Sequence, residues 1–277
     1  MRTLYVSDLD GTLLRGDQRI SAFSIEILNR VMDTGIAFSL CTARTVTGIE
    51  VLGLDALHFR LPLILMNGAM LYDYIEKRIV QSCPIDTETV STVLEICAAE
   101  GKFPFVYRVL EGIVHVFATN FTSAGEREIY QKRNQAFPGL FHMVRSYDRA
   151  PALYFSMQDT RERLERLQQH LKGLPGVSSA MYEDKYRKDN WYLEIFSADA
   201  GKDKGALRLK EKADAQRMVA FGDNLNDLPL FAEADVACCV ANGLAAAKKA
   251  ADIQIGSNHE DGVANYLKKV LDGTFAL

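Results

Sequence analysis

Two aspartates follow a short apolar segment near the start of the chain, within the run Leu4-Tyr5-Val6-Ser7-Asp8-Leu9-Asp10-Gly11-Thr12. The apolar residues predict a strand, and residues two apart along a strand point to the same side. Asp8 and Asp10 therefore converge where the strand ends, and Gly11 allows the chain to turn sharply there. Two adjacent carboxylates repel each other unless one is protonated or a cation lies between them. The run indicates a cation site beside a carboxylate nucleophile, with an acidic β-turn as the alternative interpretation.

Polar residues also follow two other predicted strands. Strand Ile36–Cys41 ends in Thr42-Ala43-Arg44, and strand Met218–Phe221 runs into Gly222-Asp223-Asn224-Leu225-Asn226-Asp227. Each group alone has a local explanation, because threonine caps helices and a Gly-Asp-Asn segment forms turns. Parallel strands, however, bring their carboxyl ends to one crevice, and such sheets bind ligands there.

The acids at these strand ends predict a magnesium site. Asp8, Asp10, Asp223 and Asp227 would repel one another strongly if they met in this crevice. Mg²⁺ is usually held by a few carboxylates together with waters and substrate oxygens. A magnesium site beside a phosphate-sized pocket suggests phosphoryl chemistry.

A positive group is also required, because a phosphoryl group in transfer is anionic. The candidates are Lys202, Lys204 and Arg44. We expect Lys202 to be a solvated surface residue. We expect Lys204, which Gly205 follows and which opens a core helix, to contact the phosphoryl oxygens.

The order of the predicted elements gives an α/β fold class, with a doubly wound parallel (Rossmann-like) sheet. Strands and helices alternate at both ends of the chain. The predicted strands are 4–6, 36–41, 63–66, 218–221, 235–240 and 253–255, and the predicted helices are 22–35, 46–52, 203–213, 228–234, 244–251 and 262–271. Residues 1–81 and 191–277 are predicted to form this catalytic core.

The middle of the chain, residues 82–190, predicts an inserted α+β cap domain with its own antiparallel sheet. Asp86 caps a helix, and Glu111-Gly112 joins the strands of a hairpin. The other predicted elements are helices 126–136 and 161–172 and strands 153–157, 177–182 and 191–196. The charged and aromatic stretch 182–192 is expected to be an exposed hairpin.

Composition excludes several classes of protein. The 277 residues are 48% hydrophobic and carry a net charge of −4 without a basic stripe, so no nucleic-acid partner is expected. The five cysteines have no CxxC spacing and predict buried reduced thiols. The first strand leaves no room for a signal peptide, and the apolar run Leu61–Met66 is too short to span a bilayer. We therefore expect a soluble cytoplasmic protein without a membrane partner.

These motifs resemble those of the haloacid dehalogenase superfamily of phosphohydrolases, and within it the Cof-like hydrolases. Asp8-Leu9-Asp10-Gly11-Thr12 matches the first motif, and Gly222-Asp223-Asn224-Leu225-Asn226-Asp227 matches the fourth. Cys41-Thr42-Ala43-Arg44 resembles the second, with Ala43 in place of the usual glycine, and Lys204-Gly205 matches the third. Three further segments resemble motifs of the Cof-like hydrolases: Asn67-Gly68-Ala69, Val240-Ala241-Asn242-Gly243 and Glu260-Asp261-Gly262-Val263.

The resemblance implies a role for each motif residue. Asp8 would be the nucleophile that forms an aspartyl-phosphate, and Asp10 the general acid and then the general base. Mg²⁺ would be held by the Asp8 carboxylate, the Asp10 backbone carbonyl and Asp223, with Asp227 in support. The residues expected at the phosphate or substrate are Thr42, Ala43, Arg44, Lys204 and Asn226. The cap would close over the site and select the leaving group.

The resemblance thus implies a magnesium-dependent phosphatase of small phosphorylated metabolites, with sugar phosphates as the first expectation. A phosphomutase is an alternative, because it also uses an aspartyl-phosphate. A non-catalytic phosphoprotein switch similar to a response-regulator receiver is another. The chain length, the inserted domain and the second aspartate two residues after the first argue against the switch.

Overall fold

The computed structural model describes residues 2–184 and 189–274. The chain divides into two compact units, one comprising Met1–Gln81 with Gly201–Leu277 and the other Ser82–Ala200. The second boundary of the inserted unit therefore falls after residue 200, whereas the sequence placed it after residue 190.

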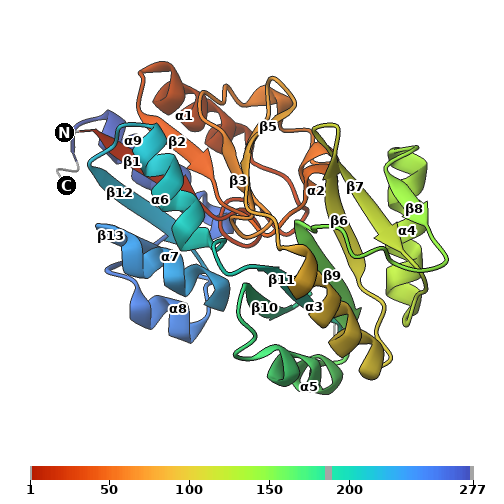
Figure 1. The fold of residues 1–277 in the computed structure, drawn as a ribbon. Helices are drawn as coiled ribbons and strands as arrows, with labels where there is room; N and C mark the ends of the chain where they lie inside the picture. Colours follow the sequence, from red (N-terminus) through yellow and green to blue (C-terminus); the bar gives the residue numbers. More distant parts are fainter. Residues whose placement is uncertain (1, 185–188, 275–277) are drawn as a thin grey trace. The chain divides into compact units, whose positions relative to one another are not determined.

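The core unit is built on a parallel five-stranded sheet with the order β14-β13-β12-β1-β2 (Figure 1). The strands are β1 (Thr3–Ser7), β2 (Ala37–Leu40), β12 (Arg217–Gly222), β13 (Val236–Val240) and β14 (Ile253–Ile255). All four residues of β2 are buried, as expected for a strand that is covered on both faces.

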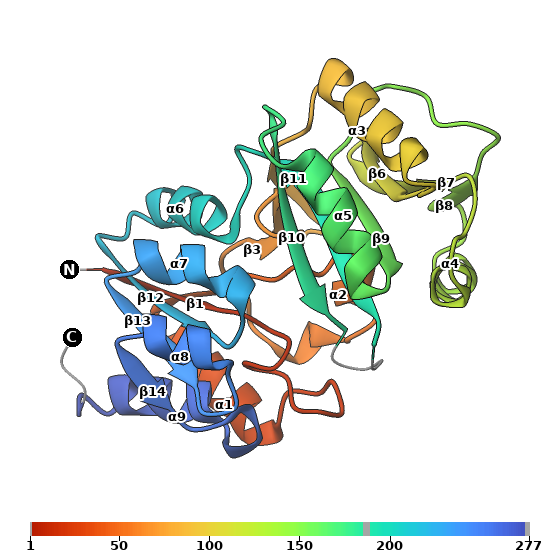
Figure 2. The same ribbon diagram turned by 90° about the horizontal axis from the view of Figure 1, so that it is seen from below.

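Helices cover both faces of this sheet. They are α1 (Ala22–Asp33), α2 (Val46–Glu50), α6 (Lys202–Lys212), α7 (Leu228–Glu233), α8 (Ala245–Ala250) and α9 (Gly262–Leu271). Helix α1 packs against α9, whereas α7 packs against α6 and α8 (Figure 2). The β1-α1-β2 and β12-α7-β13 connections run in opposite directions along the sheet, so right-handed crossovers place α1 and α7 on opposite faces. The doubly wound α/β prediction is confirmed.

A small antiparallel sheet joins the core unit beside β2. It consists of β3 (Leu63–Leu65), β4 (Met70–Asp73) and β5 (Arg78–Ser82), and Cys41 and Ile64 form an isolated parallel bridge. The prediction of β3 was correct, but β4 and β5 were missed. The turn between them has no glycine: Asp73 Oδ1 accepts hydrogen bonds from the Ile75 and Glu76 amides, and Lys77 takes a φ of 50°.

The inserted unit carries a six-stranded sheet with the order β10-β11-β9-β6-β7-β8. Its elements are α3 (Thr87–Ala99), β6 (Phe105–Leu110), β7 (Ile113–Ala118), α4 (Ala124–Ala136), β8 (Phe141–Met143), β9 (Tyr154–Asp159), α5 (Arg161–Leu171), β10 (Val177–Glu183) and β11 (Trp191–Ser197). The sheet is mixed, because β7 and β8 are parallel. Helices α3 and α5 pack against each other, and their buried side chains share one apolar core with the sheet.

Strand β11 explains the position of the second boundary. It pairs antiparallel with both β9 and β10, so its seven residues belong to the inserted unit. The predicted hairpin 182–192 agrees with the Tyr182–Tyr192 pair in this ladder, and residues 185–188 of that prediction lie outside the described residues.

The composition led to expectations about the cysteines and about membrane spans. All five cysteines are free, and four of them are buried. None of the helices in the described ranges combines the length and the apolar character that a membrane crossing needs.

The turn between β3 and β4 approaches Gly201, the N-cap of α6, closely enough to be tested by mutation. Gly68 has a φ of 82°, and a Cβ atom there would lie 1.9 Å from the Gly201 carbonyl oxygen. Gly35 has a similar φ of 88°, but a Cβ atom there meets no described atom within 4 Å. We predict that Gly68→Ala lowers the free energy of unfolding by about 3 kcal/mol or more, against about 1 kcal/mol for Gly35→Ala. Urea denaturation of both variants measures the difference, and equal losses would contradict the proposed close approach.

Candidate active site

The register of the parallel sheet aligns the three strand ends that carry the predicted motifs. Ser7 at the end of β1 pairs with Phe221 of β12 on one side and with Leu40 of β2 on the other. The next residue, Asp8, donates its backbone N–H to the Phe221 carbonyl at 2.9 Å. The segments that follow these strands therefore begin side by side at the same edge of the sheet, as the sequence predicted.

Three aspartates meet at this edge of the sheet. Asp8, Asp223 and Asp227 each place a carboxylate oxygen within 4.8 Å of those of the other two. Their exposed fractions are 5%, 5% and 0%, so water screens their mutual repulsion poorly. Thr12 supports the cluster by donating its hydroxyl to Asp223 Oδ1 at 3.2 Å.

Lys202 lies between two of these carboxylates. Its Nζ donates to Asp8 Oδ1 and to Asp227 Oδ1, both at 2.6 Å, and its exposed fraction is 2%. Burial by itself lowers the pKa of this amine, but the neighbouring carboxylates of Asp227 and Asp8 raise the pKa well above its usual value. Lys202 is therefore positively charged at neutral pH.

The expectation that Lys202 is a solvated surface residue is wrong. Lys204, which the sequence analysis placed at the phosphate, is exposed. Each residue of a helix is rotated by about 100° around the axis, so residues two apart differ by about 200°. The two lysines of α6 therefore lie on different faces. The buried residues of α6 are Lys202, Gly205, Ala206 and Leu209, and this i, i+3, i+4, i+7 spacing is the signal that identifies Lys202.

Asp227 is fixed by the tight turn that carries it. Its Oδ2 accepts the backbone N–H groups of Asp223 at 2.9 Å and Asn224 at 3.0 Å, which leaves Oδ1 directed at Lys202. The turn passes so close to Gly222 that a Cβ atom there would lie 2.6 Å from Asp227 Cγ. The motif Gly222–Asp227 thus folds back on itself and brings its first and last aspartates together.

Asp10 is not one of the three clustered acids and forms an ion pair with Arg44. Arg44 Nε donates to Asp10 Oδ2 at 2.7 Å, and Arg44 Nη2 donates to Asp10 Oδ1 at 2.6 Å. Arg44 also donates to the Gly48 carbonyl at 3.2 Å and to Gln18 Oε1 at 3.2 Å. The sequence predicted Asp10 and Arg44 at the site, but it did not predict this two-point ion pair.

The remaining predicted residues lie on the same strand ends. Thr42 is buried, and its hydroxyl oxygen accepts the Arg44 backbone N–H at 3.1 Å, so the hydroxyl proton can still be donated. Ala43 and Asn226 are half-buried. Their contacts to a substrate stay predictions.

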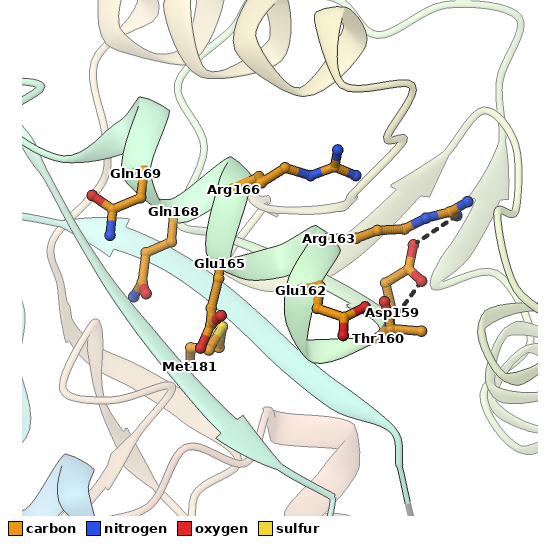
Figure 3. Close-up of a pocket in the computed structure, with 9 residues that line it drawn as sticks. All are labelled: Asp159, Thr160, Glu162, Arg163, Glu165, Arg166, Gln168, Gln169 and Met181. Atoms are coloured by element: carbon orange, nitrogen blue, oxygen red, sulfur yellow. Dashed lines mark hydrogen bonds and ion pairs between the residues drawn. The ribbon is translucent and has the colours of Figure 1, made fainter.

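A hollow of about 1020 Å³ lies along α5 of the inserted unit (Figure 3). Charged and amide side chains of α5 line it together with Met181 of β10. All of its lining residues belong to the inserted unit, whereas every predicted site residue belongs to the core unit. None of the predicted site residues therefore lines this hollow.

A family model for haloacid dehalogenase-like hydrolases matches residues 5–267. The chain belongs to this family. It is 26% identical over 294 residues to 5-amino-6-(5-phospho-D-ribitylamino)uracil phosphatase YwtE of Bacillus subtilis (strain 168), covering 97% of this chain and 98% of that protein. It is also 26% identical over 270 residues to pyridoxal phosphate phosphatase YbhA of Escherichia coli (strain K12), covering 94% and 95%.

Solved structures share the fold. A haloacid dehalogenase-like hydrolase from Bacteroides thetaiotaomicron matches with a TM-score of 0.75 and 22% identity, over 98% of this chain and 100% of that one. The subclass IIB sugar phosphatase BT4131 matches with a TM-score of 0.71 and 18% identity, over 98% and 99%. The predicted family and the predicted class of enzyme, a phosphohydrolase of the haloacid dehalogenase type, are confirmed by these comparisons.

The acid cluster fits the metal site of this family. Asp8, Asp223 and Asp227 supply hard oxygen donors, which Mg²⁺ and similar cations prefer. Three carboxylates face one ammonium group, so an additional positive charge would relieve the remaining repulsion.

The two lysines provide a matched test of the cluster. We predict that Lys202→Met lowers the free energy of unfolding by about 3–5 kcal/mol, because it leaves two buried carboxylates without their cation. Lys204→Met should change it by less than about 0.5 kcal/mol, as an exposed substitution does. Urea denaturation in chelator-treated buffer measures both, and similar values for the two variants would contradict the assignment of Lys202.

A second prediction concerns the cation itself. Asp223→Asn keeps an oxygen that can accept the Thr12 hydroxyl but removes one negative charge. We expect the dissociation constant for Mg²⁺ to rise about tenfold or more, because ligand charge sets affinity at such sites. Calorimetric titration with Mg²⁺ measures it, with Asp272→Asn on the exposed end of α9 as the control. Unchanged affinity in Asp223→Asn would place the cation elsewhere.

Proposed function

We propose that this enzyme hydrolyses the phosphate monoesters of small metabolites, through an aspartyl-phosphate formed on Asp8. The observation that carries the proposal is the buried contact between Asp8 and Lys202 at the edge of the sheet. A carboxylate held in one orientation by an ammonium group is prepared to attack phosphorus in line. The same ammonium group lies where it can offset charge on the phosphoryl oxygens.

The reaction has two displacement steps. In the first, an Asp8 oxygen bonds to phosphorus, the bond from phosphorus to the ester oxygen breaks, and Asp10 protonates the departing oxygen. In the second, Asp10 takes a proton from water, whose oxygen attacks phosphorus and releases inorganic phosphate and the Asp8 carboxylate. The net change is hydrolysis of the ester, and both aspartates return to their starting states.

Arg44 adds a condition to the first step. A carboxylate that accepts two bonds from a guanidinium is ionised, so Asp10 can act as an acid only after Arg44 has released at least one oxygen. We propose that the substrate phosphate, which is the stronger attraction for a guanidinium, draws Arg44 away. Arg44 would then contact the substrate, as the sequence predicted.

Lys202 replaces Lys204 in the proposed set of phosphate contacts. Thr42 would donate its hydroxyl to a phosphoryl oxygen, and Ala43 and Asn226 would line the same position. Asp8, Asp223 and Asp227, with the Asp10 backbone carbonyl, would hold Mg²⁺, which supplies positive charge to the phosphoryl oxygens when it is bound.

The proposed substrate class is small phosphorylated metabolites. Sugar phosphates are the first expectation from the sequence. The named relatives act on a phosphorylated ribitylaminouracil and on pyridoxal phosphate, so phosphate esters of compounds that carry a flat nitrogen-containing ring belong in the same test. The role of the inserted unit in choosing among them stays a prediction.

We predict that Asp8→Asn lowers kcat by roughly three orders of magnitude or more, because an amide is a poor nucleophile. The melting temperature should change little, because Lys202 keeps its bond to Asp227 and one of three mutually repelling carboxylates is neutralised. Phosphate release from a panel of sugar phosphates, ring phosphates and p-nitrophenyl phosphate, with and without chelator, measures the activity. Asp272→Asn on the exposed end of α9 is the control.

Turnover by Asp8→Asn at the wild-type rate would contradict the nucleophile. Disappearance of the substrate without an equivalent amount of inorganic phosphate would point to phosphomutase activity. Full activity of the wild type after exhaustive chelation would contradict the requirement for Mg²⁺.

A further inference from the structure

The asparagine of the segment Val240–Gly243 has no role in the chemistry above, although the sequence analysis singled out that segment. In the structure, Asn242 Nδ2 donates to the Gly11 carbonyl at 2.7 Å. Its Oδ1 accepts the backbone N–H of Asn258 at 2.9 Å. One side-chain amide therefore connects the turn directly after Asp10 to a segment almost 250 residues later in the sequence.

Two neighbouring residues extend this connection along the same loop. Asn258 is buried and donates its Nδ2 to the Leu14 carbonyl at 2.7 Å. Asp261 accepts hydrogen bonds from Arg15 Nη2 at 2.7 Å, Ser21 Oγ at 2.7 Å and Ser24 Oγ at 3.1 Å. The loop from residue 11 to the start of α1 is thus held by the C-terminal part of the core unit.

This loop reaches Asp10 in two ways. Gly11, whose carbonyl Asn242 holds, has a φ of 86° and sets the direction in which the chain leaves Asp10. Gln18, farther along the loop, accepts a hydrogen bond from the Arg44 guanidinium that grips the Asp10 carboxylate. Movement of the loop would therefore move both the backbone of Asp10 and the partner of its side chain.

We propose that Asn242 is a positioning residue for Asp10, which it keeps at the place where a leaving group is protonated. The inference rests on the proposed function, since it assigns Asn242 to the acid step of that reaction. The hydrogen bond to Gly11 carries the effect, and the bond to the Asn258 amide holds Asn242 itself in place.

The geometry makes a specific kinetic prediction. The ratio kcat/KM covers the steps up to phosphorylation of Asp8 and departure of the leaving group. An alkyl phosphate needs Asp10 in this phase, because an alkoxide leaves poorly without a proton. p-Nitrophenyl phosphate does not, because p-nitrophenolate is a stable anion. Displacement of Asp10 should therefore affect the two esters differently, whereas general damage to the site would affect both.

The test uses Asn242→Ala and Asn242→Asp in the full-length enzyme. In Asn242→Asp the side chain can still accept the Asn258 N–H but cannot donate to the Gly11 carbonyl. This variant therefore removes only the hydrogen bond to Gly11. Asn265→Ala is the control, because Asn265 Nδ2 also donates to a backbone carbonyl of the C-terminal segment, that of Glu260, at 2.7 Å. Melting temperatures show whether each variant folds. If Asn242→Ala does not fold, the kinetics of Asn242→Asp provide the test.

We expect both Asn242 variants to lower kcat/KM for an alkyl phosphate by about 10- to 100-fold, as small displacements of a catalytic group do. For p-nitrophenyl phosphate the loss should be less than about threefold, and Asn265→Ala should match the wild type for both esters. Equal losses of kcat/KM for the two esters, or no loss for either, in an active variant would overturn the role of Asn242. The proposed function would be unaffected by that result. A wild-type enzyme that releases no phosphate from any ester would overturn the proposed function and this inference with it.

Discussion

Repulsion between buried carboxylates is the constraint around which the core unit is arranged. Asp8, Asp223 and Asp227 come together at an edge where water reaches them poorly, and such a group is unfavourable without positive charge. Lys202 supplies part of that charge, and its own burial is tolerated only because two carboxylates accept its hydrogen bonds. The cluster is thus stable as a unit, and each member depends on the others.

The parallel sheet and its turns bring these residues together at this edge. Strands β1, β12 and β2 end in register, so residues from distant parts of the sequence emerge side by side. Tight turns then direct the side chains: the turn after β12 lets Asp227 cap the Asp223 amide while it faces Lys202. A second group, Asp10 with Arg44, lies on the same strand ends but keeps its charges paired internally. The site therefore gives different partners to Asp8, the proposed nucleophile, and Asp10, the proposed acid and base.

Much of this arrangement could be predicted from local sequence patterns. The acids follow apolar strands, and alternation of strands and helices predicts that parallel strand ends meet. The position of Lys202 was also present in the pattern, since the spacing of Lys202, Gly205, Ala206 and Leu209 marks the buried face of α6. The prediction favoured Lys204 because it weighed the neighbouring glycine instead of that periodicity.

Other features depend on contacts that local patterns do not contain. Strand β11 joins the inserted unit by pairing with β9 and β10, so the boundary after residue 200 follows from long-range pairing. Strand β8 has three residues and no glycine marks the turn from β4 to β5, so these short strands are hard to recognise. The partners of Asp10 and Asn242 lie tens to hundreds of residues away in the sequence, and only the folded chain reveals them.

We infer that Asp8, Asp223 and Asp227 share one divalent cation. Anomalous scattering from crystals soaked in Mn²⁺, which replaces Mg²⁺ at oxygen sites, tests it most directly. The account predicts a strong peak within about 2.5 Å of carboxylate oxygens of Asp8 and Asp223, with Asp227 in direct or water-mediated contact. A peak at another group of acids, with this cluster vacant at saturating Mn²⁺, would contradict it.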